Sequence, residues 1–476
     1  MADSKRLLVM DASNVYANAI GKEHGLTRAE VNGLKTRIRD AHRRIEARRD
    51  ADVGFMTLPY DRALAGRVKD KAAELRGWCK NFVVLGIGGS ALGNIAVHSA
   101  LNHPFHNSLR DAHPGRLGAP RIFVLDNVDP ALMAGFLDAI EDELERTAFN
   151  VITKSGSTAE TMSQFLFVQD LLRGRGLEPA RHIIVTTDPR PSVSLLQRVA
   201  QRDGYFALPI PANVGGRFSV LSAVGLLSAA VGGVDVDELL AGAGEMDGQC
   251  RAAGMADNPA AQYAAIHYLF YQKKTPITVL MPYSQALGRL ADWYCQLWAE
   301  SLGKRDGLSA KDVFVGPTPI AAVGVTDQHS VMQLFQDGPF DKVLTLIEVE
   351  NPKSAPWRKG SEDVPICHGE GEGELSYLAR STFGRLFSAE LAATRCALRD
   401  KHRPNLTLRV PEVSARTLGE LFMFFEYAVT YSGCLYDVNT FDQPGVELGK
   451  DYTYGLMGRE GYKPPKGAGQ GPQADR

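Results

Sequence analysis

The sequence lacks the cysteine patterns that hold metal ions or small extracellular scaffolds together. Its 6 cysteines are far apart, and none of them forms a C-x-x-C pair. This spacing excludes a zinc ribbon and a compact disulfide framework, because both need closely spaced thiols. We therefore expect reduced cysteines, a cytoplasmic setting and no bound metal.

Charge of one sign and long hydrophobic runs are also lacking. The 53 Lys and Arg against 55 Asp and Glu give a formal net charge of -2, whereas a general nucleic-acid binder needs a basic surplus. The longest uncharged stretch, Phe218–Val234, is short for a membrane span and contains serines and glycines, so it predicts a buried core helix. Met1–Lys5 leads into no apolar signal region, so we expect no secretory signal. From the balanced charge and the short apolar stretch, we expect neither a nucleic-acid partner nor a membrane.

Short apolar runs alternate with helical patterns through most of the chain. Such alternation predicts parallel sheets that are covered on both faces, hence an α/β protein with two three-layer αβα domains. The expected parts are a helical N-terminal segment at 1–75, a first α/β domain at 76–212, a helical connector at 213–255, a second α/β domain at 256–412, and a C-terminal helix and tail at 413–476 with Lys450 in a loop.

The N-terminal segment contains a basic helix. Thr27 and Glu30 have the spacing of a capping box, and residues 35–49 interleave many basic side chains with a few acidic ones. This pattern is typical of a solvated helix face, with an anionic partner as the alternative. The pattern itself assigns the helix no role.

A glycine-rich turn follows the first expected strand. In Gly86–Gly93 (GIGGSALG), backbone N–H groups near Gly89 and Ser90 and a helix start could face an anion. The turn also fits G-x-G-x-x-A, a loose dinucleotide pattern that expects an acidic residue about 20 positions on. The nearest acid at a strand end is the more distant Asp126. A phosphate site, a dinucleotide site and a turn without a ligand all stay open here.

Hydroxyl groups gather after the third expected strand. Residues 153–161 (TKSGSTAET) form a hydroxyl-rich helix start in which Ser157 and Glu160 have capping-box spacing. Because parallel strands end at one edge of a sheet, we expect this loop and Ser90 to bind a single phosphate. The candidate phosphate ligands in the loop are Thr153, Lys154, Ser155 and Thr158.

Three further positions are candidates for reaction chemistry. Arg217 precedes the apolar helix, where a cation opposes the helix macrodipole, so it is either a surface residue or an electrophile facing an anionic intermediate. Glu300 lies one turn after Gln296 at the edge of an apolar helix face, as a general base or as the ion-pair partner of Lys304. His329 lies in the first turn of an expected helix, whose dipole favours a neutral ring; a structural histidine is the alternative.

Taken together, these segments resemble the signature blocks of the glucose-6-phosphate isomerase family. Five blocks in the expected order are far more specific than any one of them. The blocks are Gly86–Gly93 (GIGGSALG), Gly215–Ser219 (GGRFS), Gln296–Lys304 (QLWAESLGK), Asp327–Ser330 (DQHS) and Phe441–Lys450 (FDQPGVELGK). The resemblance implies two sugar-isomerase (SIS-type) domains. It also implies cofactor-free, reversible isomerisation of glucose 6-phosphate and fructose 6-phosphate through ring opening and a cis-enediolate, in glycolysis and gluconeogenesis.

The resemblance also implies roles for individual residues. Glu300 would move a proton between C2 and C1, and Arg217 would stabilise the enediolate. His329 and Lys450 would act in ring opening, with His329 entering the neighbour's site in a homodimer. The sugar phosphate would be bound by Gly89, Ser90, Thr153, Lys154, Ser155, Thr158, Gly216, Gln296 and Gln443.

The departures from the family pattern are small. Thr153 stands where Ser is commoner and Pro444 where Trp is often found, and neither change removes a reacting group. Two alternatives stay open: another sugar-phosphate aldose–ketose isomerase, acting on mannose 6-phosphate, and a sugar-phosphate sensor without catalysis.

Overall fold

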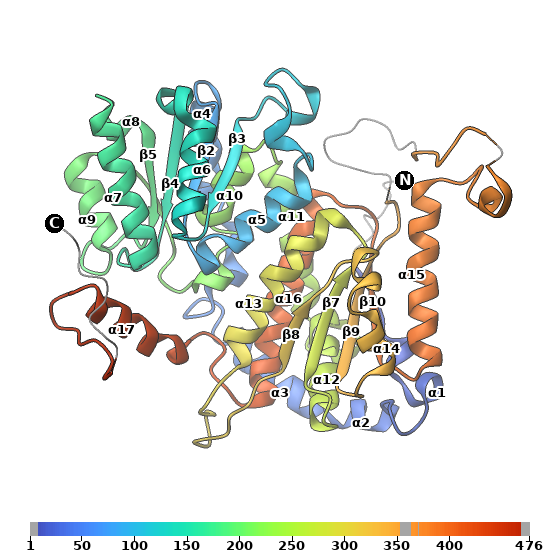
Figure 1. Ribbon diagram of the computed structural model, residues 1–476. Coiled ribbons are helices and arrows are strands. Elements are labelled where there is room, and N and C mark those ends of the chain that lie inside the picture. Colours follow the sequence, from blue (N-terminus) through green and yellow to red (C-terminus); the bar gives the residue numbers. More distant parts are fainter. Residues whose placement is uncertain (1–7, 353–362, 370, 468–476) are drawn as a thin grey trace.

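The computed structural model describes residues 8–352, 363–369 and 371–467. Two five-stranded sheets form the two α/β halves, and helices pack on both faces of each sheet (Figure 1). The expected α/β class is thereby confirmed. Two segments about which the sequence makes a prediction lie outside the described residues. They are residues 1–5, on which the expected lack of a secretory signal was based, and residues 468–476 of the expected tail. The domain boundaries given above stay a prediction.

The first sheet is wholly parallel, with strand order β3-β2-β4-β5-β6. Alternate strand residues face different layers: Val84 packs against one set of helices and Val83 against the other. The strands are β2 (Asn81–Leu85), β3 (Arg121–Leu125), β4 (Thr147–Ile152), β5 (Ile183–Thr187) and β6 (Phe206–Pro209). One face is covered by α4 (Arg62–Arg76), α5 (Leu92–Leu101) and α10 (Ala223–Val231), the other by α6 (Pro130–Ile140), α7 (Ala159–Gly174) and α9 (Leu195–Asp203).

The second sheet has strand order β1-β10-β9-β7-β8. Four of its strands are parallel, and β1 joins β10 antiparallel. The strands are β1 (Val9–Asp11), β7 (Ile277–Pro282), β8 (Thr318–Ala321), β9 (Lys342–Val349) and β10 (Asn405–Val410). One face is covered by α12 (Pro259–Gln272), α13 (Gly288–Leu302) and α16 (Ala415–Tyr436), the other by α14 (Met332–Asp337) and α15 (Phe383–Asp400).

The apolar stretch after Arg217 forms the expected core helix. Every residue of α10 from Ala223 to Val231 is buried, and the helix packs against α4 and α5. Ser222 caps it, since its Oγ accepts a hydrogen bond from Val224 N at 3.2 Å. None of the helices within the described ranges is long and apolar enough to cross a membrane.

The N-terminal segment differs from the expected all-helical segment, because β1 precedes its helices. Those helices are α1 (Ala17–Ile20), α2 (Arg28–Gly33) and α3 (Lys35–Glu46). The capping box is confirmed: Thr27 Oγ1 accepts from Glu30 N at 3.1 Å, and Glu30 Oε2 accepts from Thr27 N at 2.6 Å.

The basic N-terminal face is solvated as expected at six of the seven Lys and Arg residues between 35 and 49, and Arg49 is the exception. Arg49 Nη2 donates to Asp247 Oδ1 at 2.8 Å and to the Tyr427 hydroxyl at 2.6 Å. The Asp247 side chain, on α11 (Val236–Cys250), is 0% exposed, and a buried carboxylate needs such a partner. This network joins the end of α3 to α11 and α16.

Candidate active site

The loops after β2 and β4 lie next to each other at the carboxyl edge of the first sheet. Strand β2 pairs with β3 on one side and with β4 on the other, so the strand order reverses between β2 and β4. Ligands of parallel sheets bind at such a reversal. The structure brings the turn at 86–90 and the hydroxyl loop at 153–158 to this point, as the sequence predicted.

Glycines allow the turn at 86–90 to contact the segment that carries Arg217. A Cβ on Gly89 would lie 2.3 Å from the carbonyl carbon of Gly216. Gly88 has a φ of +56°, and a Cβ there would lie 3.0 Å from Gln296 Nε2. The backbone of Gly216 excludes a side chain at Gly89, and the positive φ disfavours one at Gly88. Because Ser90 ends this turn, the close contact places Ser90, Gly216 and Gln296 in one region.

The hydroxyl groups of the second loop have different surroundings. Thr153 is 2% exposed, and its Oγ1 lies 2.9 Å from Thr158 Oγ1 in a hydrogen bond. Ser155 is exposed, and its Oγ accepts from Ser157 Oγ at 3.2 Å. Helix α7 begins after Thr158, which occupies the N-cap position without a side-chain cap bond. The expected Ser157–Glu160 capping box is therefore wrong, because Ser157 bonds back to Ser155.

Lys154 braces this loop. Its Nζ donates to the carbonyl oxygens of Ala212 and Val214, both at 2.8 Å, and burial lowers the pKa of its ammonium group. These bonds link the hydroxyl loop to the chain just before Arg217. Two of the three ammonium donors are thereby used within the protein.

Arg217 and Glu300 form an ion pair beside these loops. Arg217 is 3% exposed; its Nη1 donates to Glu300 Oε2 at 3.2 Å and its Nε to Ser301 Oγ at 2.8 Å. Gln296 Nε2 donates to the other carboxylate oxygen, Glu300 Oε1, at 2.9 Å. Burial lowers the pKa of Arg217, although the negative charge of Glu300 opposes this. The Glu300 side chain keeps 32% exposure, so a bound molecule can reach a carboxylate whose two oxygens are both oriented.

A segment near the end of the chain, residues 440–443, completes the set of hydrogen-bond acceptors around Arg217, which we call the shell of Arg217. The guanidinium donates through Nη2 to the carbonyl oxygens of Thr440 and Asp442 and through Nη1 to Gln443 Oε1, the last at 2.9 Å. Five acceptors on two elements thus fix its orientation. The alternative of Arg217 as a surface residue is wrong.

Lys304 supports the site through the backbone of Glu300 and through Asp442, and not through the Glu300 carboxylate that the sequence offered as its partner. Its Nζ donates to the backbone oxygen of Glu300 at 2.8 Å and pairs with Asp442 Oδ1 at 3.0 Å. The alternative pairing with the Glu300 carboxylate is wrong, since Arg217 and Gln296 hold that group. Ser301 and Lys304 were both missed as supports, although both lie in the block 296–304.

His329 lies at the other end of α13 from Glu300. It follows β8 in a 3₁₀ turn, Thr326–His329. This turn lies near the start of α13, because a Cβ on Gly288, the first residue of that helix, would lie 3.1 Å from the side chain of Val323 just before the turn. Glu300 is roughly 12 residues further along α13, or about 18 Å at the rise of an α-helix. The exposed His329 ends its turn rather than beginning a helix, so the expected effect of a helix dipole on it is wrong.

Lys450 lies on a helix and not in the expected loop. This helix, α17 (Glu447–Leu456), contacts the hydroxyl loop, because the Tyr454 hydroxyl donates to the Ser157 carbonyl at 3.1 Å (Figure 1). Lys450 Nζ is bound to Glu447 Oε1, one turn away, at 2.8 Å. The structure therefore brings α17 to the hydroxyl loop but pairs Lys450 within its own helix.

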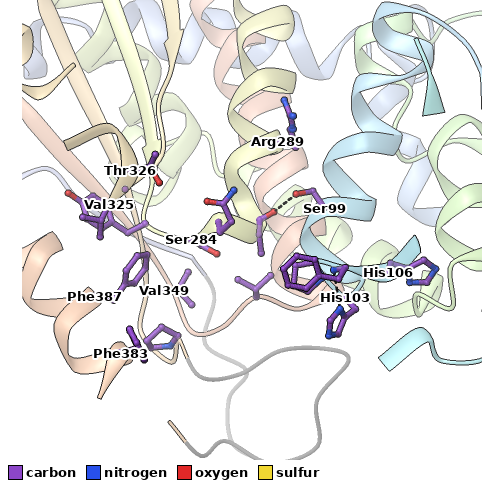
Figure 2. Close-up of a pocket in the computed structure, with 18 of the residues that line it drawn as sticks. Ser99, His103, His106, Ser284, Arg289, Val325, Thr326, Val349, Phe383 and Phe387 are labelled. Carbon is purple, nitrogen blue, oxygen red and sulfur yellow. Dashed lines mark hydrogen bonds between the residues drawn. The ribbon is translucent and has the colours of Figure 1, made fainter. Parts of the chain in front are cut away.

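A large cavity of about 1230 Å³ lies elsewhere, between the two halves of the molecule. Figure 2 shows Ser284, Val325 and Thr326 from the carboxyl edge of the second sheet on one side and Ser99 and His103 on the other. Arg289, near the start of α13, also lines it. The cavity includes neither Glu300 nor Arg217, so the oriented side chains, and not cavity size, identify the candidate site.

Within the described ranges, no group of three His, Cys, Asp or Glu side chains is arranged to hold a metal ion. All six cysteines are free thiols. The groups that the site offers to a bound molecule are therefore a carboxylate, an amide and the hydroxyl and backbone groups of two loops, and the buried guanidinium of Arg217 adds a positive charge behind the carboxylate.

Comparisons with known proteins agree on one family. The phosphoglucose isomerase family model matches residues 62–350 and 390–458. Glucose-6-phosphate isomerase of Carboxydothermus hydrogenoformans is 44% identical over 460 residues, covering 96% of both chains. That of Rubrobacter xylanophilus is 44% identical, covering 95% of this chain and 99% of the other. The crystal structure of a hypothetical protein from Thermus thermophilus has a TM-score of 0.82 at 34% identity and covers 95% of this chain and 100% of that one.

Proposed function

This chain belongs to the phosphoglucose isomerase family, and we propose that it interconverts glucose 6-phosphate and fructose 6-phosphate. The observation that carries the proposal is the Glu300 carboxylate, oriented by Arg217 and Gln296 next to two loops suited to a phosphate. A sensor without catalysis would need the loops but not a partly exposed carboxylate held in this way. The proposed place of the reaction is glycolysis and gluconeogenesis in the cytoplasm.

In the proposed mechanism, Glu300 carries one proton between two carbons. Its carboxylate removes the C2 proton of the open-chain aldose and returns it to C1, while the proton of the C2 hydroxyl moves to the oxygen on C1, so the bond changes balance without a redox partner. The intermediate is a cis-enediolate, whose negative charge faces the guanidinium of Arg217. The hydrogen bonds that this guanidinium donates to Ser301 and to residues 440–443 fix its orientation before the charge develops.

The phosphate is proposed to bind between the two loops of the first sheet. Ser90, Ser155 and Thr158 provide hydroxyls there, and Gly89 provides a turn without a side chain. Thr153 acts through its bond to Thr158, and Lys154 acts by bracing the loop and by its charge. Binding this remote group positions C1 and C2 against Glu300.

Replacing Ser155 with Ala should weaken binding of a phosphorylated inhibitor by about 10- to 100-fold, since a hydrogen bond to a charged group is worth about 1.5–3 kcal/mol. Inhibition constants for 6-phosphogluconate and for unphosphorylated gluconate provide the measurement, and only the first should change. Ser163→Ala is the control, because that hydroxyl donates to the Glu160 carbonyl on α7. An equal loss for both inhibitors would count against a phosphate contact at Ser155.

Ring opening is assigned to His329 and Lys450, which pass a proton to and from the ring oxygen. In a single chain, His329 is separated from Glu300 by most of the length of α13, as described above. This separation supports a homodimer in which His329 of one copy completes the site of the other. Gly216 and Gln443, from the same copy as Glu300, would lie around the sugar. Lys450 would have to exchange Glu447 for the substrate.

The direct test is turnover of glucose 6-phosphate, followed as fructose 6-phosphate formed. We expect turnover that a metal chelator does not change, since the proposed steps use only protein carboxylate, imidazole and cationic groups. Mannose 6-phosphate is the comparison substrate and should react much more slowly. Turnover of mannose 6-phosphate without turnover of glucose 6-phosphate would replace this proposal with the alternative isomerase.

A further inference from the structure

The orientation of Arg217 depends on residues 440–443, which Lys304 holds at Asp442 by an ion pair and a hydrogen bond. Two of its acceptors are the backbone oxygens of Thr440 and Asp442, which lie on either side of Phe441 in the chain. Asp442 and Gln443 are exposed, whereas Phe441 is partly buried and packs against the main core. The Phe441 ring is therefore the apolar anchor of this segment.

Two groups hold the Phe441 ring. The ring of Phe218, the residue after Arg217, has its centroid 5.2 Å from that of Phe441 and stacks in turn on Phe55 at 5.3 Å. The guanidinium carbon of Arg48 lies over the Phe441 ring, 5.2 Å from its centroid. A cation in this position is attracted by the ring quadrupole. The contact joins the N-terminal segment to the shell of Arg217.

Arg48 is itself fixed in place. Its Nε donates to Asp52 Oδ1 at 2.9 Å and its Nη2 to Asp52 Oδ2 at 2.7 Å, a two-point pairing with defined geometry. The next residue, Arg49, belongs to the buried network with Asp247 and Tyr427. The end of α3 is thus anchored to the core, and Arg48 extends from a fixed backbone.

We propose that Arg48 and Phe441 are positioning residues for Arg217. They hold residues 440–443 so that the carbonyl oxygens of Thr440 and Asp442 aim the guanidinium at the enediolate. Neither side chain contacts the substrate. The proposal rests on the proposed function for the role of Arg217, and it assigns a role to Arg48, in the turn after α3, within the basic stretch 35–49 whose role the sequence alone left open.

Arg48→Met keeps the length of the side chain and removes its charge. We expect kcat to fall by about two- to fivefold, the range that an exposed cation–π contact supports, with KM unchanged. A hydroxamate analogue of the enediolate should bind more weakly by the same factor, whereas sorbitol 6-phosphate should bind as before. Arg48→Lys should restore most of kcat, because a cation remains over the ring. Phe441→Leu should lower kcat at least as much, and Phe441→Tyr should retain it.

Arg39→Met is the matched control, since it removes one exposed positive charge from α3, the helix just before Arg48. Its kcat and the Tm values of all variants should stay near those of the wild type. An unchanged kcat in Arg48→Met, or an equal fall in Arg39→Met, would overturn the positioning role. Failure of the wild type to turn over glucose 6-phosphate would instead contradict the proposed function, so the two failures are distinguishable.

Discussion

Glu300→Gln should lower isomerisation by about 10²–10⁴-fold, because an amide cannot accept the C2 proton. The structure indicates that the site survives this change. Arg217 Nη1 can still donate to the new amide oxygen, and the Gln296 amide can turn its oxygen, which is buried without a hydrogen-bond partner, toward the new NH₂ group. The measurement is exchange of the C2 proton with deuterated solvent, followed by NMR, beside the affinity for sorbitol 6-phosphate.

We expect exchange to disappear while that affinity stays within about twofold, since the amide keeps the volume and polarity of the carboxyl group. Glu447→Gln is a control for loss of a carboxylate, because Glu447 is exposed and pairs with Lys450 on α17. Normal exchange in Glu300→Gln would exclude Glu300 as the base and would leave its ion pair with Arg217 as a structural contact.

Mixing two inactive variants should restore activity if His329 acts in the neighbouring copy. Glu300→Gln and His329→Ala should each be nearly inactive as pure homodimers. In a mixed dimer of twofold symmetry, one of the two sites contains both native residues and the other contains neither. Random re-association of equal amounts should therefore give about a quarter of the wild-type activity. The measurement is turnover after the mixture has been dissociated and reassembled.

A mixture of Glu300→Gln with Arg217→Ala provides the control for this experiment. Those two residues belong to the same site of the same chain, since their side chains are 3.2 Å apart, so no mixed dimer contains a native site. Activity in the first mixture and none in the second would locate His329 in the partner's site. Equal failure of both mixtures would contradict the shared site.

The sequence predicted the parts of the site that carry local signals. Strand, glycine turn and helix follow each other around Gly89, and the hydroxyls after β4 are concentrated in a few residues. Parallel strands then place both loops at one edge, as the sheet order shows. Glu300 was found because its position on a helix can be derived from the period of the apolar residues around it.

Other features depend on contacts between distant residues, and for these the sequence interpretation was incomplete. Arg49 resembles any solvated arginine until α3 packs beside Asp247. Lys154 is a cation in a hydroxyl-rich loop and was therefore predicted to be a phosphate ligand, yet its ammonium group donates to the carbonyls of Ala212 and Val214. Strand β1 is three residues long, and no local pattern indicates that it pairs with β10. The roles of the site residues stay predictions that the experiments above address.

The pairing of β1 with β10 has a consequence for the order in which the molecule is built. Val9 is opposite Arg409, so the second sheet gains its edge strand only after nearly the whole chain has been synthesised. At about 5–20 residues per second, the first strand waits on the order of 20–80 s for its partner. The first sheet, β2 to β6, is complete much earlier. Since residues 440–443 emerge later still, the residues around Arg217 come together only after the strands of both sheets have been synthesised.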